Sequence, residues 1–301
     1  MKKTIHLNSC KLCNSNSINE KYACRDYLVT GEVYPVIQCS KCGFIFTNDY
    51  PDENDIGSYY KSEKYISHSD RRTGAVDRLY HLARKIMLSR KYRIVRKYSG
   101  LKRGSLLDIG CGTGYFPAYM KSKDWDAEGV EKDKEARVFA SEFNRVNVSG
   151  SEKLDNLEPG FYDCITLWHV LEHFHDPDQL LKQAADALKD NGIMIIALPN
   201  NRSFDARHYG AAWAAWDVPR HLWHFSPGTM AVYLRKFRLV TEAVSRLPFD
   251  AFYVSILSEQ TQGSRFSLLK GMFFGKISWL NSLAKRDETS SLAYIVKKSG
   301  N

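Results

Sequence analysis

The sequence predicts an α/β fold, a Rossmann-like sheet of mainly parallel strands preceded by a small cysteine-rich module. Two patterns and the composition support this prediction. At residues 105–114 (SLLDIGCGTG) a short apolar strand runs into three glycines at alternate positions, the turn that leads from strand to helix in such sheets. Two CxxC pairs lie within the first 42 residues. With 301 residues, 44% of them hydrophobic and 26% charged, the chain suffices for one large core and a small appended module.

The cysteine pairs predict a structural zinc site in a zinc-ribbon-like module over residues 1–50. Each pair can direct two thiolates at one tetrahedral ion, and four thiolates leave no open position for catalysis. The four cysteines are Cys10, Cys13, Cys39 and Cys42. We expect thiols rather than disulfides, because the start of the chain does not read as a secretory signal and the protein is therefore expected in the cytoplasm. Cys24, between the pairs, is expected in the core.

A basic region over residues 51–103 is expected to connect this module to the sheet. Apolar residues at helical spacing predict a helix over 77–98. Nine lysines and arginines but no acidic residue occur between positions 84 and 103, as many as the chain's net charge of +9. Such a face can contact nucleic acid, an anionic membrane or a phosphorylated substrate, and it can equally be a solvated helix surface.

The glycine loop favours a ligand with a cationic end. Gly110, Gly112 and Gly114 let a ligand lie against bare backbone, and the helix expected from about Tyr115 points its positive end at the same place. Asp108 stands two residues before the first glycine. Its carboxylate would repel a pyrophosphate but attract the ammonium group of an amino acid, so the loop suits such a cofactor better than a dinucleotide.

The run DIGCGTG at residues 108–114, with the strands that follow it, resembles motif I of the class I S-adenosylmethionine (SAM)-dependent methyltransferases. The resemblance extends over residues 104–301 and implies a seven-stranded sheet with SAM bound at the loop. The loop residues assigned to the cofactor are Asp108, Gly110, Cys111, Gly112 and Gly114. A second strand at 127–130 ends in Glu131, 21 residues after Gly110, where Rossmann-type folds place the carboxylate that binds ribose hydroxyls.

The remaining strands follow in the order that this superfamily uses. Residues 161–173 (FYDCITLWHVLEH) predict a buried fourth strand that ends in polar residues. Residues 192–200 predict a fifth strand, after a helix over 178–189. Residues 239–246 and 290–298 predict strands six and seven, the last as the antiparallel partner that completes the sheet.

Histidines and an acid follow the fourth strand in WHVLEHFHDP, residues 168–177. The run resembles a methyltransferase subfamily that includes the ubiquinone-pathway O-methyltransferases, in which a glutamate stands at the position of His169 and the run can hold a divalent ion. Because His169 stands where those relatives have a glutamate, metal-dependent methylation of a catechol is not expected here. If the segment is helical, His169, Glu172 and His173 share one face. Three roles stay open: a wall of the SAM pocket together with Trp168, acid–base catalysis, and a metal site.

A polar and aromatic loop at residues 211–227 (AAWAAWDVPRHLWHFSP) is the expected acceptor site, because α/β enzymes place substrate at loops after parallel strands. Its tryptophans are expected in the core. His221 is the first candidate for the catalytic base, with Arg220 beside it to hold an anionic group, and His173 with Glu172 is the second. Similar RHLxHF runs occur in methyltransferases of surface-polysaccharide and natural-product gene sets, often with a zinc ribbon, which implies a sugar or another small polar acceptor.

An apolar segment, residues 266–283, carries Lys270 and Lys276. It can lie on a membrane as an interfacial helix, or pack against the zinc module or a second subunit. Gly271 and Gly275 favour packing. No run of 18 or more uncharged apolar residues exists, so no membrane span is expected.

The predicted function is methyl transfer from SAM to the oxygen, nitrogen or carbon of a small-molecule acceptor. One alternative is an RNA base methyltransferase that grips RNA with the zinc ribbon and the basic helix. Against it, the fourth strand ends in LWHVLEH instead of the Asn/Asp-Pro-Pro-aromatic run of amino-group base methyltransferases. A second alternative is a non-catalytic SAM-binding scaffold, which would have no use for the arginine and histidines of the acceptor loop.

Overall fold

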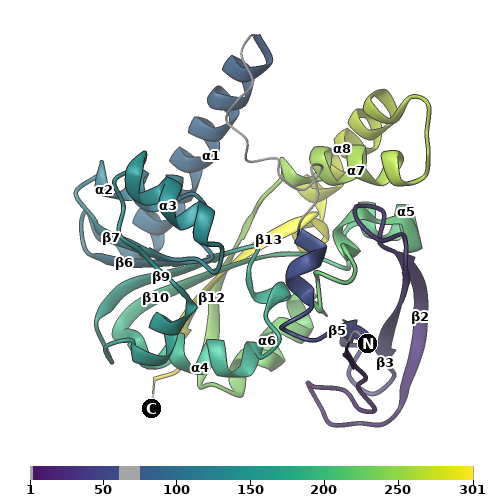
Figure 1. Cartoon of the computed structure of the whole chain (residues 1–301), viewed down its shortest axis with the longest axis horizontal. Coiled ribbons are helices and arrows are strands. Elements are labelled where there is room, and N and C mark those ends of the chain that lie inside the picture. Colours follow the sequence, from purple (N-terminus) through teal and green to yellow (C-terminus); the bar gives the residue numbers. More distant parts are fainter. Residues whose placement is uncertain (1–2, 61–74, 301) are drawn as a thin grey trace.

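The computed structural model describes residues 3–60 and 75–300, with side chains from residue 84 onward in the second range. A seven-stranded sheet forms its centre, in the order β12-β13-β10-β9-β6-β7-β8 (Figure 1). The strands are β6 Ser105–Ile109, β7 Asp126–Val130, β8 Val148–Ser149, β9 Tyr162–Trp168, β10 Leu188–Pro199, β12 Leu239–Arg246 and β13 Ser291–Lys298. β13 runs antiparallel to both of its neighbours, whereas the other pairs are parallel. The predicted sheet and its antiparallel last strand are confirmed.

Helices cover both faces of this sheet because the strands are apolar on both sides. Leu106 and Ile193 point to one face, where α1 (Ala75–Ser99) and α2 (Tyr115–Lys121) pack, and they share a core with Val95 of α1. Leu107 and Met194 share the opposite core with residues of α4 and α6. The helices that follow α2 are α3 Lys134–Glu142, α4 Pro177–Ala187, α5 Phe204–Tyr209, α6 Pro227–Arg235, α7 Asp250–Thr261 and α8 Ser267–Ala284.

Most predicted elements agree with the structure to within a few residues, but the predicted boundary between α4 and β10 differs. β10 begins at Leu188, four residues before the expected start, and an irregularity in its pairing with β9 follows Leu188. The helix expected over 178–189 therefore ends earlier, at Ala187. The helix expected over 77–98 is α1, which buries Ile94 and Val95 as expected but leaves Ile86 exposed. Within the predicted connecting region 51–103, residues 61–74 and the side chains of residues 75–83 lie outside the described part of the structure.

The N-terminal module is a β-rich unit that shares a sheet with the rest of the chain. Its elements are β1 Thr4–Ile5, β2 Ile18–Arg25, β3 Val33–Cys39, β4 Ile45–Thr47, β5 Tyr50–Pro51 and the 3-10 helix η1 Ile56–Tyr60. Its four-stranded sheet has the order β11-β4-β3-β2, and β11 is Trp223–His224. The module is thus completed by two residues of the loop that was predicted to bind the acceptor.

The chain between β12 and β13 forms a helical hairpin, α7 and α8 (Figure 1). The backbone of α8 approaches α7 closely: a Cβ atom added at Gly271 would lie 2.4 Å from Ile256 Cα, and one at Gly275 would lie 2.7 Å from Phe252 Cα. The glycines therefore serve close packing, as the sequence indicated. Within the described ranges, no helix combines the length and the apolar character needed to cross a bilayer.

Candidate functional site

The glycine loop lies at the carboxyl end of β6 and has three left-handed glycines, with φ of +68° at Gly110, +55° at Gly112 and +78° at Gly114. Two of them are also required by packing. A Cβ atom added at Gly110 would lie 2.5 Å from Val170 Cγ2, and one at Gly114 would lie 2.8 Å from Ala140 Cβ. Around the corresponding position at Gly112 no atom lies within 4 Å, so the middle of the loop is open for a ligand to approach.

Glu131 lies beside the open part of this loop. One of its carboxylate oxygens accepts a hydrogen bond from the Gly112 backbone N–H at 2.9 Å, and the other accepts from the Asp133 N–H at 2.9 Å. These two bonds hold the carboxylate at the end of β7 and next to the loop. Acceptor oxygens in this position suit the hydroxyl groups of a ribose.

Asp108 is 3% exposed and lies at the floor of the site. Its carboxylate accepts a hydrogen bond from Thr166 Oγ1 at 2.6 Å. Burial raises its pKa to about 6, opposed by the positive charge of Lys91. The Lys91 ammonium lies 4.6 Å from the centre of the Trp168 ring and 5.5 Å from that of Phe116. The sequence did not single out Lys91 within the basic segment, since nothing in the helix pattern indicates which lysine faces the sheet.

His169 follows β9 and is held between two acids. Its Nδ1 atom lies 3.5 Å from Glu172 Oε1, and its Nε2 atom lies 3.3 Å from Asp250 Oδ2. Burial alone would lower its pKa, but the hydrogen bonds and charges of Asp250 and Glu172 raise it to about 9. The ring is therefore cationic at neutral pH. Asp250 begins α7, and its role could not be predicted because it lies 81 residues from His169.

The segment after β9 is not an α-helix. His169 has a left-handed backbone with φ of +58°, and Leu171–His173 forms a single 3-10 turn. Glu172 is 1% exposed and contacts His169, while His173 turns toward the acceptor loop. The expected common helix face is therefore wrong in its geometry, although Glu172 still lies near both histidines.

His173 and His221 meet at this place, with ring centres 4.5 Å apart. One ligand atom each from Glu172, His173 and His221 lies within 4.8 Å of the others. Burial and the charge of His221 lower the pKa of His173 to about 4, so this ring is neutral at neutral pH. His221 Nδ1 lies 2.9 Å from the Ala215 carbonyl oxygen. Because a carbonyl only accepts, Nδ1 carries the hydrogen, and Nε2 of a neutral His221 has a free lone pair.

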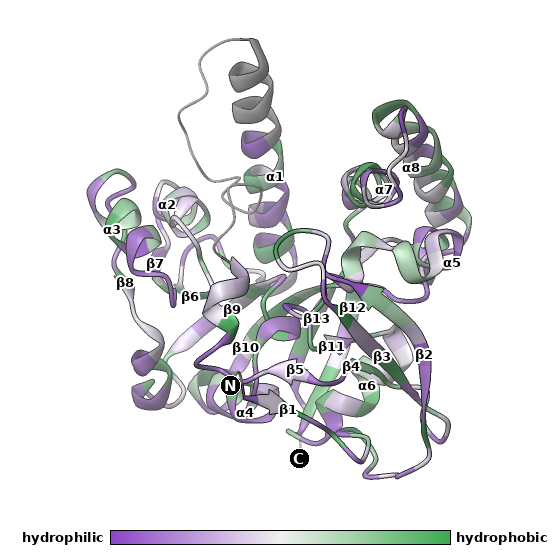
Figure 2. Ribbon diagram, turned by 45° about the vertical axis from the view of Figure 1, so that its right-hand side comes forward, coloured by the Kyte–Doolittle hydropathy of each residue, from purple (hydrophilic) through white to green (hydrophobic). Residues whose placement is uncertain are grey.

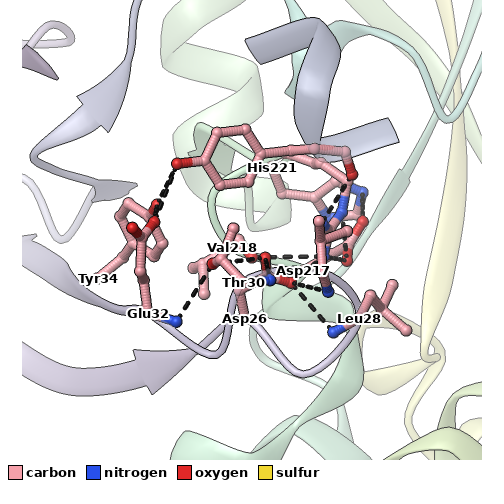
Figure 3. Close-up of polar contacts among 11 residues, drawn as sticks. Asp26, Leu28, Thr30, Glu32, Tyr34, Asp217, Val218 and His221 are labelled. Carbon is pink, nitrogen blue, oxygen red and sulfur yellow. Dashed lines mark hydrogen bonds and ion pairs between the residues drawn. The ribbon is translucent and has the colours of Figure 1, made fainter. Parts of the chain in front are cut away.

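Arg220 is 1% exposed, and its partners Asp26 and Asp217 lie close together (Figure 3). Its guanidinium donates to Asp217 Oδ1 at 2.7 Å, to Asp26 Oδ1 at 3.1 Å and to the Tyr59 carbonyl oxygen at 3.1 Å. The expectation that Arg220 holds an anionic group of the acceptor is therefore wrong. Its charge is needed to balance the buried carboxylate of Asp26 and the partly buried one of Asp217, and Asp26 belongs to the turn after β2 of the N-terminal module.

The N-terminal module also holds the backbone that follows this arginine. Thr47 Oγ1 donates to the His221 carbonyl oxygen at 2.7 Å, and the Thr47 N–H donates to that of Leu222 at 2.9 Å. Tyr60 contributes a side chain, whose hydroxyl lies 3.0 Å from His173 Nδ1. The tryptophans of the loop are core residues as expected, since Trp213, Trp216 and Trp223 are at most 2% exposed.

The four cysteines of the CxxC pairs meet in the N-terminal module. Cys10 and Cys42 have sulfur atoms 3.6 Å apart, as do Cys13 and Cys39, and all four sulfurs lie within 4.8 Å of one another. A disulfide would bring two sulfurs to about 2 Å, whereas four sulfurs around a tetrahedral Zn²⁺ are about 3.8 Å apart. The donor set and its spacing fit zinc. Cys24 is 2% exposed in a separate core, as predicted.

Comparison with known proteins agrees with this geometry. A family model described as a methyltransferase domain matches residues 80–243. A ubiquinone biosynthesis O-methyltransferase from Xanthomonas euvesicatoria pv. vesicatoria is 27% identical over 158 residues, which cover 48% of this chain and 66% of that protein. Its counterpart from Idiomarina loihiensis is 25% identical over 174 residues, covering 54% and 72% respectively. The chain thus spans just under two thirds of the length of the first relative.

Among solved structures, a proposed sarcosine dimethylglycine methyltransferase from Galdieria sulphuraria has a TM-score of 0.51 and 16% sequence identity. The superposition covers 74% of this chain and 88% of that one. At this level of identity the likeness concerns the fold alone.

Proposed function

This chain belongs to the methyltransferase domain family, and on that premise we propose that it transfers the methyl group of SAM to a small-molecule acceptor. The observation that supports this most is the open glycine loop at Gly112, with the Glu131 carboxylate bonded to its backbone. Val170, which lies against Gly110, leads into the segment that ends in His173, whose ring meets that of His221. SAM would supply an already activated methyl group. The protein then has to hold both partners in line and, for a protonated acceptor, remove a proton.

The residues proposed to hold SAM are those of the glycine loop with Glu131 and Asp108. Gly112 leaves room for the cofactor against bare backbone, and Glu131 offers two acceptor oxygens to the ribose. Asp108 is proposed to act from beneath the loop, because its charge lies close to the site although its surface is buried. Trp168 and His169 are proposed to form the wall next to it.

The residue proposed as base is His221, with His173 as the alternative. Nε2 of a neutral His221 has the free lone pair, and Asp217 Oδ2 lies 3.8 Å from it. His173 is neutral at neutral pH, which a base must be, but its pKa of about 4 makes it a weak one. His169 is already cationic, and both of its ring nitrogens face acids, so it is not proposed as a base.

The acceptor proposed is a small polar molecule such as a sugar or another precursor of surface polysaccharides or natural products. The site is built from histidines and carboxylates, which recognise hydroxyl groups. The ubiquinone-pathway relatives are named as O-methyltransferases, and oxygen is accordingly the first atom to examine. Zinc is proposed at Cys10, Cys13, Cys39 and Cys42 as a structural ion, because four thiolates leave no position for a reactant.

Calorimetry with SAM, S-adenosylhomocysteine and NAD tests the cofactor site. Gly112→Val should abolish binding of the first two, since its side chain would stand where the loop is open. Gly160→Val is the matched control. Gly160 also has a left-handed φ, +64°, and open space around its Cβ position, but it precedes β9 and so lies at the amino-terminal ends of the parallel strands, away from the glycine loop. Unaltered SAM affinity in Gly112→Val would remove the loop from the proposal.

Mass spectrometry of products tests the reaction. The protein is incubated with cell extract and isotope-labelled SAM, and the labelled product is identified. A small labelled molecule supports the proposal, and label in RNA bases would replace it with the nucleic-acid alternative. SAM binding without any labelled product, in extracts of several growth conditions, would favour a scaffold.

A further inference from the structure

The outer face of α8 exposes large apolar side chains. Six of them are between 47% and 70% exposed: Leu268, Leu269, Met272, Phe273, Leu280 and Leu283. The opposite face of the helix is made of small residues and packs against α7. Isolated exposed apolar residues are ordinary, but a continuous apolar helix face marks an interaction surface. The expectation that this segment is buried therefore holds for one face of α8 only.

An apolar groove and a cationic cleft adjoin this face. The groove, of about 480 Å³, is lined by Phe249, Phe252, Met272, Phe273, Trp279 and the stem of Lys276. The cleft, of about 440 Å³, lies between α1 and the start of α7, and its charged lining residues are Arg90, Arg93 and Lys97. Phe249 lines both, with the Arg90 guanidinium 5.7 Å from its ring centre. An apolar and a cationic surface are thus continuous.

The charges around these surfaces are mostly positive. α8 contains two lysines and no acidic residue, and Arg265 and Arg286 flank it, whereas Lys285 pairs with Glu288. Asp287 is an exposed acid beyond the end of α8, while Asp250 is engaged with His169 and Glu259 is buried. α1 and the α7–α8 hairpin extend from the same end of the molecule in both views (Figures 1 and 2). Figure 2 also shows α8 as one of the most hydrophobic segments at this end.

We propose that this end of the protein binds an anionic lipid bilayer. The apolar face of α8 would lie among the acyl chains near the headgroups, and the cleft at Arg90, Arg93 and Lys97 would receive an anionic headgroup. A second copy of the chain would bring equal positive charge to the same place, and inorganic phosphate or RNA would leave the apolar face in water. The proposal does not rest on the proposed function.

Vesicle co-sedimentation tests the proposal with the full-length protein. Vesicles of phosphatidylcholine with phosphatidylglycerol should bind the protein, those of phosphatidylcholine alone should bind it much less, and added salt should weaken the binding. The double substitution Leu269→Ser with Phe273→Ser should reduce partitioning at least about ten-fold, because both side chains lose acyl contacts. Lys97→Glu should reduce it at least about five-fold.

Matched controls separate this surface from general effects. Phe143→Ser removes a 69% exposed aromatic from the end of α3, and Lys182→Glu reverses an exposed charge on α4; neither should change partitioning. Circular dichroism should show all variants folded. Equal binding to neutral vesicles, or unchanged binding of the α8 variant, would overturn the proposal. So would a dimer, seen by light scattering, that the α8 variant loses, or competition by inorganic phosphate that removes all binding.

Discussion

At the scale of single residues, the tautomer of His221 determines which of its ring nitrogens can act as a base. Its Nδ1 hydrogen is committed to the Ala215 carbonyl, so Nε2 is the atom that can accept a proton. We expect His221→Ala to lower the turnover of the identified acceptor about 10²–10⁴-fold while SAM affinity, measured by calorimetry, stays unchanged.

His221→Asn separates catalysis from loop structure. Asparagine can keep the bond to Ala215 but cannot act as the base, so activity should stay low if the ring removes a proton. Recovery of most activity in this variant would show that the ring only shapes the loop and would move the proposal to His173. A variant at His208, a histidine packed against Phe274 of α8, serves as a control for the general loss of an imidazole.

His169 makes the free energy of unfolding depend on pH between about 6.5 and 9. Its pKa is raised from 6.5 to about 9 in the folded protein, so the folded state binds this proton more tightly than the unfolded state. The resulting stability is fully present below pH 6.5 and is lost as the pH rises through about 9. His169→Asn, which tolerates the left-handed backbone, should flatten thermal stability across this window.

The size of this pH effect is limited by solvent, since 37% of the His169 side chain is exposed. His173 acts in the opposite sense. Its pKa is lowered to about 4, so its contribution is present above pH 6.5 and is lost as the pH falls toward 4. Melting curves of His169→Asn should therefore differ most from the parent below pH 6.5 and approach it as the pH rises through about 9; an equal shift at every pH would refute the assignment.

The sequence predicted which residues meet where a motif is contiguous. The four cysteines meet and Glu131 bonds to the glycine loop, as their spacings indicated, and the roles assigned to them stay predictions. Lys91, Asp250, Asp26 and Tyr60 enter the site from distant segments, and no local pattern distinguishes them from surface residues. Arg220 was misjudged for the same reason, because its partner Asp26 lies 194 residues away.

At the scale of elements, the α7–α8 contact depends on the absence of side chains at two glycines. Gly275→Ala would place a Cβ atom 2.7 Å from Phe252 Cα and 3.1 Å from the Ala251 carbonyl oxygen, both backbone atoms that cannot rotate away. We expect a loss of about 1–3 kcal/mol in the free energy of unfolding, measured with denaturant. Gly228→Ala in α6 is the control, because it too is a helical glycine but has open space.

Gly228→Ala should leave stability unchanged or raise it slightly, since alanine favours helix over glycine. If both variants behaved alike, the close approach of α8 to α7 would not be present in solution. The glycines could be predicted to serve packing from the sequence. The exposure of the other face of α8 could not, because an apolar helix pattern does not indicate which side has a partner.

Element boundaries were predicted to within a few residues for the long, apolar strands, as β6 and β13 show. The two-residue strand β11 was missed. It exists because Trp223 pairs with Phe46 and His224 with Ile45, so its stability comes from a partner about 180 residues away. Alternating polar and aromatic residues gave no period from which to infer it.

At the scale of the whole molecule, strand pairing and hydrogen bonds connect the cysteine site to the acceptor loop. Cys39 and Cys42 lead directly into β4, β4 pairs with β11, and Thr47 at the end of β4 binds the carbonyl group of His221. Asp26 of the same module binds Arg220 next to that histidine. The N-terminal module is therefore part of the wall of the proposed acceptor site.

This connection predicts that loss of zinc impairs the acceptor site and spares the cofactor site. In Cys42→Ser, elemental analysis should show little zinc, and hydrogen exchange should speed up across residues 217–225, because β4 no longer has a fixed end. SAM affinity should stay within about two-fold, since among the described residues no hydrogen bond joins the glycine loop to the module. Thr47→Val is the companion variant: it keeps the cysteines and removes only the hydroxyl bonds to the His221 carbonyl oxygen and to His224 Nε2, so it should retain zinc and show a smaller increase in exchange, confined to the loop. Zinc loss with unchanged exchange at 217–225 would show that the module folds without supporting the loop, and His221 would then have to be held by the larger sheet alone.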